Sequence, residues 1–265
     1  MILHFAHANG FPASSYQELF KHLKPNFKVG YIDCIGHNPE YPITDGWSHL
    51  VEELIDHIKT QYNEPVVGVG HSLGGMLTFM AAQQQPELFK SIILLDPPLY
   101  GYVKSSALRF GKVFNFIDRI VPGGNAERRR KHWSSEQGMV EYFQNKKLFQ
   151  DITPQCLRDY AKYGTVPNDE GGVDLKFDPV IEQSIAVHIP HTRLRVSPEF
   201  DLPFGFFHGK DSGVIKPYDV TVLRRLFKAR TKTIPGSHLF PFEYPRATAK
   251  AIVNFVEKYN FNTKA

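Results

Sequence analysis

The chain has 265 residues, which is long enough for one large domain or for a core domain with an insert. Its 42% hydrophobic and 22% charged residues are typical of a globular protein, and a net charge of +4 identifies no partner. Cys34 and Cys156 are too far apart to suggest a disulfide framework, so we expect free thiols. Met1–His7 has no signal-peptide pattern, and no apolar run reaches about 18 residues. We therefore expect a cytoplasmic protein without a membrane segment.

Short apolar runs alternate with longer amphipathic segments over residues 1–100 and 198–265. Most of the runs are continuously apolar, which is typical of strands buried on both faces of a parallel sheet. The repeated strand-then-helix order predicts right-handed crossovers and a doubly wound, mostly parallel α/β sheet. In chain order, we expect strand Ile2–Ala6, helix Tyr16–Leu23, strand Val29–Ile32, helix Trp47–Gln61, strand Pro65–Val69, helix Leu73–Gln85, strand Ser91–Leu95, strand Leu202–Phe207, helix Tyr218–Phe227, strand Lys232–Ile234 and helix Ala247–Asn260.

The alternation stops in residues 101–197, where strand-like runs are scarce and aromatic and basic residues are frequent. Amphipathic patterns predict helices at Ser105–Ile120, Ala126–His132, Ser135–Lys146 and Pro154–Tyr163. We therefore expect a helical insert, residues 101–197, between two strands of a core formed by residues 1–100 and 198–265. Such an insert would lie over the carboxyl ends of the strands, where open α/β sheets bind ligands.

A G-x-S-x-G pattern, Gly70-His71-Ser72-Leu73-Gly74, lies between the third predicted strand and the helix that follows it. A strand, a sharp turn and a helix are the setting in which such a serine is exposed as a nucleophile. The glycines provide the small neighbours that this strained turn requires, and the helix N-terminus favours developing negative charge. The alternative is that Ser72 merely caps the helix. The pattern favours Ser72 as a nucleophile.

A histidine and an aspartate follow later strands, in the chain order serine, acid, histidine that accompanies a strand-turn-helix G-x-S-x-G serine. His238 stands in Gly236-Ser237-His238, after the last predicted strand, and is our candidate general base among 12 histidines. Asp211, in the loop after Leu202–Phe207, is the first candidate for the acid that orients the base. Asp96 also ends a strand at the same edge and is the alternative acid.

Two backbone N–H groups should face the oxyanion that forms during acyl transfer. Leu73, directly after the candidate nucleophile, is expected to supply one of them. The loop after the first strand, His7-Ala8-Asn9-Gly10-Phe11-Pro12, is expected to supply the other, with Phe11 as first choice and Asn9 as second.

Together these segments resemble the α/β-hydrolase superfamily over nearly the whole chain, as a serine esterase-like member with a helical cap. The residues that carry the resemblance are Asn9-Gly10-Phe11-Pro12, Asp33-Cys34-Ile35-Gly36-His37, Gly70–Gly75, His208-Gly209-Lys210-Asp211 and Gly236-Ser237-His238. The resemblance implies an α/β-hydrolase fold, here without the N-terminal hairpin that members commonly have. It also implies that residues 101–197 form a cap, and that Asp33 and His37 are structural.

Aromatic residues of the expected cap suggest an apolar pocket for an acyl group or an alcohol, or else they pack the cap's own core. They are Tyr100, Tyr102, Phe110, Phe114, Phe116, Trp133, Tyr142 and Phe143. The basic run Arg128–Lys131 is interpreted as a solvated helix face, since no nucleic-acid fold signature accompanies it.

The chemistry that these residues predict is hydrolysis of carboxylic esters through an acyl-enzyme. The alternatives on the same triad are a C–C bond hydrolase, a lactonase, a thioesterase or a cofactor-free perhydrolase. A non-catalytic ligand-binding protein on this scaffold is a third possibility. We expect no cofactor and no metal, and a monomer or homodimer acting on a small-molecule ester, with neither nucleic acid nor membrane as partner.

Overall fold

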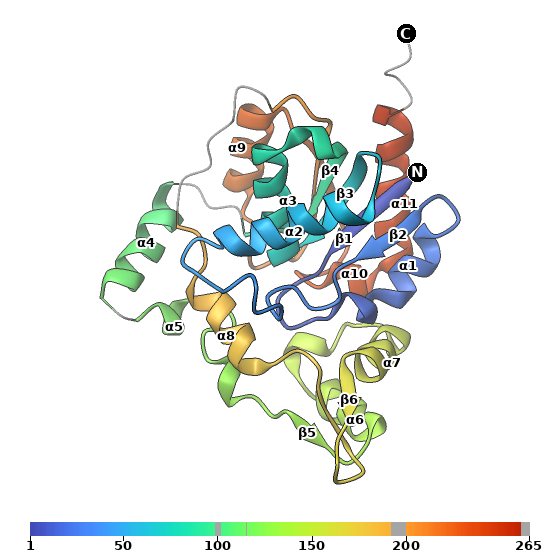
Figure 1. The fold of residues 1–265 in the computed structure, drawn as a ribbon, viewed down its shortest axis with the longest axis vertical. Coiled ribbons are helices and arrows are strands. Elements are labelled where there is room, and N and C mark those ends of the chain that lie inside the picture. Colours follow the sequence, from blue (N-terminus) through green and yellow to red (C-terminus); the bar gives the residue numbers. More distant parts are fainter. Residues whose placement is uncertain (99–101, 115, 192–199, 261–265) are drawn as a thin grey trace.

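A computed structural model describes residues 1–98, 102–114, 116–191 and 200–260. Its centre is a six-stranded sheet in which every pair of neighbouring strands is parallel, in the order β2-β1-β3-β4-β8-β9 (Figure 1). The strands are β1 (Ile2–Ala6), β2 (Lys28–Tyr31), β3 (Val66–His71), β4 (Phe89–Leu95), β8 (Phe204–Gly209) and β9 (Arg230–Ile234). The predicted doubly wound sheet is confirmed, and each strand lies where an apolar run predicts it.

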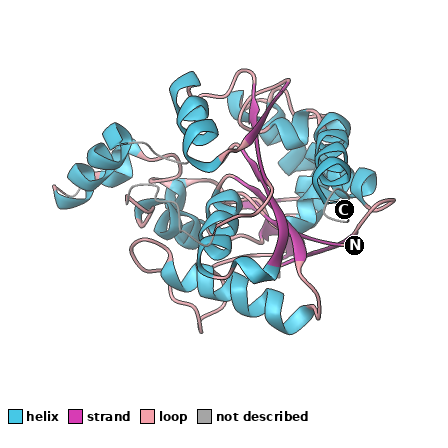
Figure 2. Cartoon of the chain, turned by 90° about the horizontal axis from the view of Figure 1, so that it is seen from above, coloured by secondary structure: helices cyan, strands magenta, loops and turns pink. Residues whose placement is uncertain are grey.

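Helices cover both faces of the sheet, which is seen nearly edge-on between them in Figure 2. They are α1 (Gln17–Leu23), α2 (Ser48–Gln61), α3 (Leu73–Gln84), α9 (Pro217–Phe227), α10 (Phe240–Glu243) and α11 (Pro245–Asn260), with short 3₁₀ helices at Ala13–Tyr16 and Pro86–Leu88.

Alternate residues of each central strand belong to two separate hydrophobic clusters. Val67 and Ile93 pack in the cluster that contains α1 and α11, whereas Val66 and Ile92 pack in the cluster that contains α2 and α3. This alternation follows from the twofold side-chain period of a strand. It explains why the strands are apolar at successive positions, since both faces of the sheet are buried.

The connection between β4 and β8 contains both helices and a second, small sheet. Its helices are α4 (Tyr102–Val113), α5 (Ile117–Ile120), α6 (Glu136–Gln144), α7 (Pro154–Tyr163) and α8 (Pro179–Val187), with short 3₁₀ helices at Ala126–Arg128 and Lys147–Phe149. Its antiparallel strands are β5 (His132–Trp133), β6 (Thr165–Pro167) and β7 (Val173–Leu175), in the order β5-β7-β6.

The expected helical insert also contains a small sheet, which the sequence did not predict. The helix predicted at Ala126–His132 is a single 3₁₀ turn, after which the chain enters β5. There His132 pairs across the small sheet with Asp174, at 2.7 Å between Nδ1 and Oδ1. Strands of two or three residues are too short to show a hydrophobic period, so the sequence could not predict them. The expected limits of the insert, at residues 101 and 197, lie outside the described residues.

The two cysteines are free thiols, and neither has the environment of a reactive nucleophile. Burial, together with the nearby Asp33 carboxylate, raises the pKa of the Cys34 thiol to about 12, and burial raises that of Cys156 to about 11. Both therefore stay protonated near neutral pH. No helix in the described part of the chain is long and apolar enough to cross a membrane.

Candidate active site

Ser72 occupies a sharp turn between β3 and α3. Its φ of 53° lies in the left-handed region, which a non-glycine residue rarely adopts. The turn is tight enough that a Cβ on Gly70 would lie 2.2 Å from the carbonyl oxygen of Gly74. The Ser72 side chain makes no capping hydrogen bond to α3, so the helix-cap alternative is wrong.

The Ser72 hydroxyl contacts a histidine from the far end of the chain. Its Oγ lies 3.0 Å from Nε2 of His238, which stands in the loop between β9 and α10. The His238 side chain is 23% exposed, so the imidazole lies at the surface of a cavity and not deep in the core. The sequence prediction that Ser72 and His238 meet therefore agrees with the geometry, which is suited to proton transfer between them.

The other nitrogen of His238 faces Asp96, directly after β4. Nδ1 of His238 lies 2.7 Å from Oδ2 of this fully buried aspartate. The hydroxyl of Ser212 donates to the same oxygen at 2.5 Å, and the Gly209 N–H donates to Oδ1 at 3.1 Å. Three hydrogen-bonding groups converge on one buried carboxylate, which fixes its orientation beside the imidazole.

Asp211, the first candidate for the acid, does not contact His238 in the structure. Its side chain is exposed, and its backbone N–H donates to the Gly236 carbonyl at 2.9 Å. The loop that carries Asp211 instead forms a hydrogen bond with the loop that carries His238, and its Ser212 hydroxyl donates to Asp96. The choice of Asp211 over Asp96 is therefore corrected: the alternative acid is the one whose carboxylate reaches the imidazole.

The first choice for the second oxyanion donor is also corrected. The Phe11 N–H donates to the Ala8 carbonyl at 3.1 Å, which closes a turn, and the Phe11 ring packs against Phe149 and Phe242. In contrast, the N–H groups of Asn9 and Leu73 have no hydrogen-bond partner among the described residues. Asn9 and Leu73 both line the cavity at Ser72, so Asn9, the second choice, has the better position.

A cavity of about 110 Å³ adjoins Ser72 and His238. Its other described walls are almost entirely apolar, and three of them come from α8 and the residues just after it. The lining residues are Asn9, Trp47, Ser72, Leu73, Pro98, Pro122, Ile185, Ala186, Ile189, Val214 and His238. The cavity is thus built jointly by the sheet's loops and by the connection between β4 and β8.

None of the described aromatic residues expected to form an apolar pocket lines this cavity. Trp133, Tyr142 and Phe143 pack with one another and with the core beneath α6 and α7. Phe110 and Phe114 are exposed and contact each other at 4.3 Å between ring centroids. Tyr100 lies outside the described residues, as does the side chain of Tyr102. The alternative, that such residues pack the insert's own structure, fits Trp133, Tyr142 and Phe143.

Pattern analysis missed α8, which supplies Ile185 and Ala186 to the cavity. A signal was present, because Asp178 caps the helix and Pro179 stands at its first position. Pattern analysis also missed Trp47, whose indole Nε1 donates to the Ile185 carbonyl at 2.9 Å. Among the described residues, no group of three or more His, Cys, Asp or Glu side chains is arranged to hold a metal ion.

A family model described as "Alpha/beta hydrolase family" matches residues 5–251. Among curated proteins, the chain is 30% identical over 110 residues to a type I acyl-CoA thioesterase, mpaH, of Penicillium roqueforti. That match covers 42% of this chain and 23% of the thioesterase. It is 28% identical over 127 residues to the monoglyceride lipase of Rattus norvegicus, which covers 44% of this chain and 42% of the lipase. The matched parts thus span less than half the length of these relatives.

Solved structures with the same fold cover nearly all of the chain. E-2-(acetamidomethylene)succinate hydrolase superposes with a TM-score of 0.76 at 20% identity, over 97% of this chain and 91% of that one. The peroxisomal α/β-hydrolase Lpx1 of Saccharomyces cerevisiae gives a TM-score of 0.73 at 16% identity, over 98% and 77%. At these identities the likeness shows the fold alone.

Proposed function

This chain belongs to the α/β-hydrolase family, and we propose that it is a serine hydrolase that cleaves carboxylic esters through an acyl-enzyme. The observation that carries the proposal is a continuous line of hydrogen-bonding contacts: Oγ of Ser72 to Nε2 of His238 at 3.0 Å, and Nδ1 of His238 to Asp96 at 2.7 Å. Serine, imidazole and buried carboxylate in this order form a catalytic triad.

In the proposed mechanism, the Ser72 oxygen attacks the ester carbonyl while Nε2 of His238 takes the hydroxyl proton. The imidazolium is stabilised by the Asp96 carboxylate, which also holds the Nδ1–H tautomer. His238 then returns the proton to the leaving alcohol, and an acyl-enzyme remains on Ser72. A water molecule, deprotonated by His238, attacks the acyl carbonyl. His238 then returns this proton to Oγ of Ser72 as the acyl–oxygen bond breaks, which releases the acid and restores the serine hydroxyl.

The tetrahedral intermediate carries a negative charge on the former carbonyl oxygen. We assign its two backbone donors to Leu73, at the N-terminus of α3, and to Asn9, since both line the cavity at Ser72. Preorganised donors of this kind stabilise the charge where it develops. The helix N-terminus adds a favourable dipole at the same position.

The cavity supports a small, uncharged and apolar group on one side of the scissile bond. No charged side chain is found among its described walls, and its volume is about 110 Å³. An engineered protein cavity of about 150 Å³ holds benzene, so acyl groups of about two to four carbons match the space here. We therefore propose short acyl esters as the preferred substrates.

A thioesterase is the second candidate, favoured by the likeness to an acyl-CoA thioesterase over 110 residues. The same three residues would act on a thioester, because only the leaving group differs. The two functions are separated by comparing an oxoester and a thioester of the same short acyl group. A kcat/KM that is higher for the thioester by tenfold or more would favour the second candidate.

The test is hydrolysis of a p-nitrophenyl ester series by the wild type and by Ser72→Ala. The exposed Ser134→Ala serves as the matched control. We expect activity on short chains, a loss of about three or more orders of magnitude in Ser72→Ala, and no change in the control. Equal activity in Ser72→Ala and wild type would overturn the proposal.

A further inference from the structure

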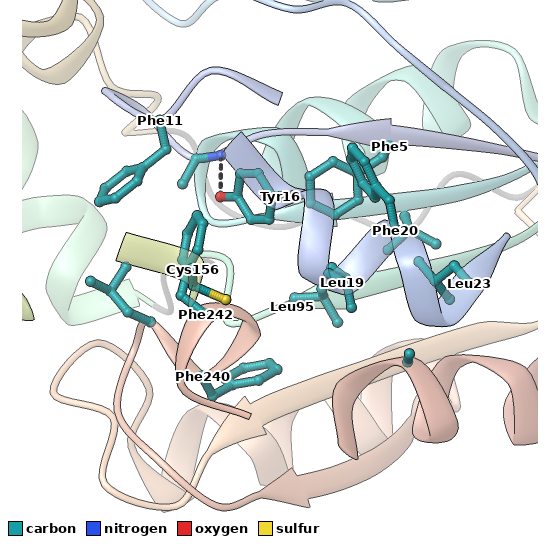
Figure 3. Packing of buried hydrophobic residues seen from close by; sticks show 14 of the residues in the cluster. Phe5, Phe11, Tyr16, Leu19, Phe20, Leu23, Leu95, Cys156, Phe240 and Phe242 are labelled. Atoms are coloured by element: carbon teal, nitrogen blue, oxygen red, sulfur yellow. Dashed lines mark hydrogen bonds between the residues drawn. The ribbon is translucent and has the colours of Figure 1, made fainter. Parts of the chain in front are cut away.

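A buried tyrosine hydroxyl holds the loop that carries Asn9. Tyr16, at the end of the 3₁₀ helix Ala13–Tyr16, is only 1% exposed. Its hydroxyl oxygen accepts the Ala8 N–H at 3.2 Å, the bond drawn as a dashed line in Figure 3. The peptide that follows Ala8 bears the Asn9 N–H, so this bond fixes the chain one residue before the proposed oxyanion donor.

The same hydroxyl lies 2.8 Å from Nδ1 of His71, the residue that precedes Ser72. The other nitrogen of His71, Nε2, lies 2.9 Å from the backbone carbonyl oxygen of His238. His71 is fully buried, and burial, with the neighbouring His238, lowers its pKa well below the usual range. Its imidazole is therefore neutral and carries one proton.

Elementary hydrogen-bond chemistry settles where that proton lies. The His238 carbonyl oxygen accepts only, so Nε2 of His71 must be the protonated nitrogen. Nδ1 is then an acceptor and takes the Tyr16 hydroxyl proton, which leaves the tyrosine oxygen free to accept from Ala8. The chain of bonds thus has one direction at each step: Ala8 N–H to Tyr16, Tyr16 O–H to His71, and His71 Nε2–H to His238.

We propose that Tyr16 and His71 are positioning residues, which hold the backbone beside the oxyanion donor and the backbone of the general base in a fixed relation to Ser72. The inference rests on the serine-hydrolase function proposed above. Neither side chain is among the described residues that line the cavity, so each acts through the groups that it orients. Residues 8 and 238 come from opposite ends of the chain, and this bridge links them through the buried side chains of Tyr16 and His71.

Tyr16→Phe is a suitable test because it removes the hydroxyl and keeps the ring. The ring packs against Phe5, Phe20 and Phe242, at 4.2 to 6.2 Å between centroids, and those contacts remain in the variant. The loss leaves the Ala8 N–H and Nδ1 of His71 without a partner in the core. Small displacements of catalytic groups cost large factors in rate.

The measurements are kcat, KM and the inhibition constant of an alkyl boronic acid, which forms a tetrahedral adduct with a catalytic serine. For Tyr16→Phe we expect kcat to fall about 10- to 100-fold, KM to stay within about threefold, and boronic-acid binding to weaken in parallel with kcat. Tyr62→Phe, which changes a half-buried tyrosine packed against His4 and His57, is the matched control and should match the wild type. A folded Tyr16→Phe with unchanged kcat and boronic-acid affinity would overturn the inference.

A second measurement needs neither activity nor a variant. Nitrogen-15 NMR of the imidazoles in the wild type should show His71 as the neutral Nε2–H tautomer. A cationic His71, or the Nδ1–H tautomer, would contradict the bridge even if Tyr16→Phe failed to fold. Failure of the proposed function is distinct, because it would appear as equal ester hydrolysis by wild type and Ser72→Ala.

Discussion

Nδ1 of His238 lies 2.7 Å from Oδ2 of Asp96, although 142 positions separate the two residues in the chain. The contact is possible because β4 pairs directly with β8 and β8 with β9, so the loops after these three strands meet at one edge of the sheet. The Asp96 N–H also donates to the Phe207 carbonyl at 2.8 Å, which fixes the aspartate to β8. The proposed acid is thus held by the sheet itself.

Asp96→Asn should lower kcat for ester hydrolysis by about four orders of magnitude, because an amide cannot stabilise the imidazolium or hold the same tautomer. Asp211→Asn, the matched control, should stay within about twofold, since the Asp211 side chain is exposed. Steady-state kinetics on a short p-nitrophenyl ester, with thermal unfolding to confirm folding, checks both. A severe loss in Asp211→Asn with an active Asp96→Asn would reverse our assignment of the acid.

Ile189→Ala should shift the preferred acyl chain toward greater length, because the Ile189 side chain forms one wall of the cavity. The loss of a buried isoleucine should also lower the free energy of unfolding by about 2–4 kcal/mol. Ile58→Ala, in α2 and also buried, should have a similar cost in stability without any change in chain-length preference. A p-nitrophenyl ester series measures the preference, and an identical profile in both variants would argue against our assignment of the cavity.

Arg129 and Glu182 form a largely buried ion pair at 2.5 Å that joins the basic run to α8. Arg129 also donates to the Tyr160 hydroxyl at 3.0 Å, and Asn9 donates to the Glu182 carbonyl at 2.8 Å. Arg129→Met leaves the Glu182 carboxylate without its ion-pair partner, although the Glu182 side chain is only 12% exposed. We expect the free energy of unfolding to fall by about 3 kcal/mol.

The neighbouring Arg128→Met is the control for this prediction, because the Arg128 side chain is 78% exposed. It should change the free energy of unfolding by less than about 0.5 kcal/mol. The double variant Arg129→Met/Glu182→Leu should recover part of the loss, since it leaves no buried charge unpaired. Denaturant unfolding curves give all three values, and equal effects of Arg128→Met and Arg129→Met would contradict the assigned pair.

Burial raises the pKa of Glu53 from 4.5 to about 7. The folded protein therefore keeps a proton on Glu53 that the unfolded chain has lost between these two pH values. Stability falls as pH rises through this window, by up to about 3 kcal/mol, because the unfolded state binds fewer protons there.

Glu53→Gln removes this dependence while the amide oxygen can still accept the Gly36 N–H, now at 2.9 Å from the carboxylate. The variant and the wild type should be nearly equally stable at pH 4.5, and the variant more stable at pH 8. The Glu52 side chain is 54% exposed, so Glu52→Gln should show the same pH dependence of the free energy of unfolding as the wild type. The test is the free energy of unfolding measured at both pH values. A difference in this free energy between Glu53→Gln and wild type that is the same at both pH values would contradict the raised pKa.

The sheet could be predicted from the sequence because its inner strands β1, β3, β4 and β8 are buried on both faces, so each appears as a short apolar run. The pairing of Ser72 with His238 could also be predicted from the sequence, because each residue follows such a run in a glycine-containing turn. The sequence favoured the wrong aspartate, Asp211, as the partner of His238, because Asp96 and Asp211 both follow strands. Only the three-dimensional relation of β4, β8 and the loop after β9 distinguishes them.

Less of the connection between β4 and β8 could be predicted from the sequence, for different physical reasons. Its strands have two or three residues, below the length at which a period can be recognised. The side chains of its basic run have different environments, because Arg128 is exposed whereas Arg129 is paired with Glu182. Such pairing depends on tertiary contacts and leaves no local pattern. The same holds for Tyr16 and His71, which are buried polar side chains with distant partners.

The most direct test of the central claim is identification of the residue that a fluorophosphonate probe modifies in the folded protein. Peptide mapping by mass spectrometry should place the adduct on Ser72, with labelling abolished in Ser72→Ala and kept in Ser134→Ala. An adduct on another residue, or no adduct on folded wild-type protein, would contradict the assignment of Ser72 as an activated nucleophile.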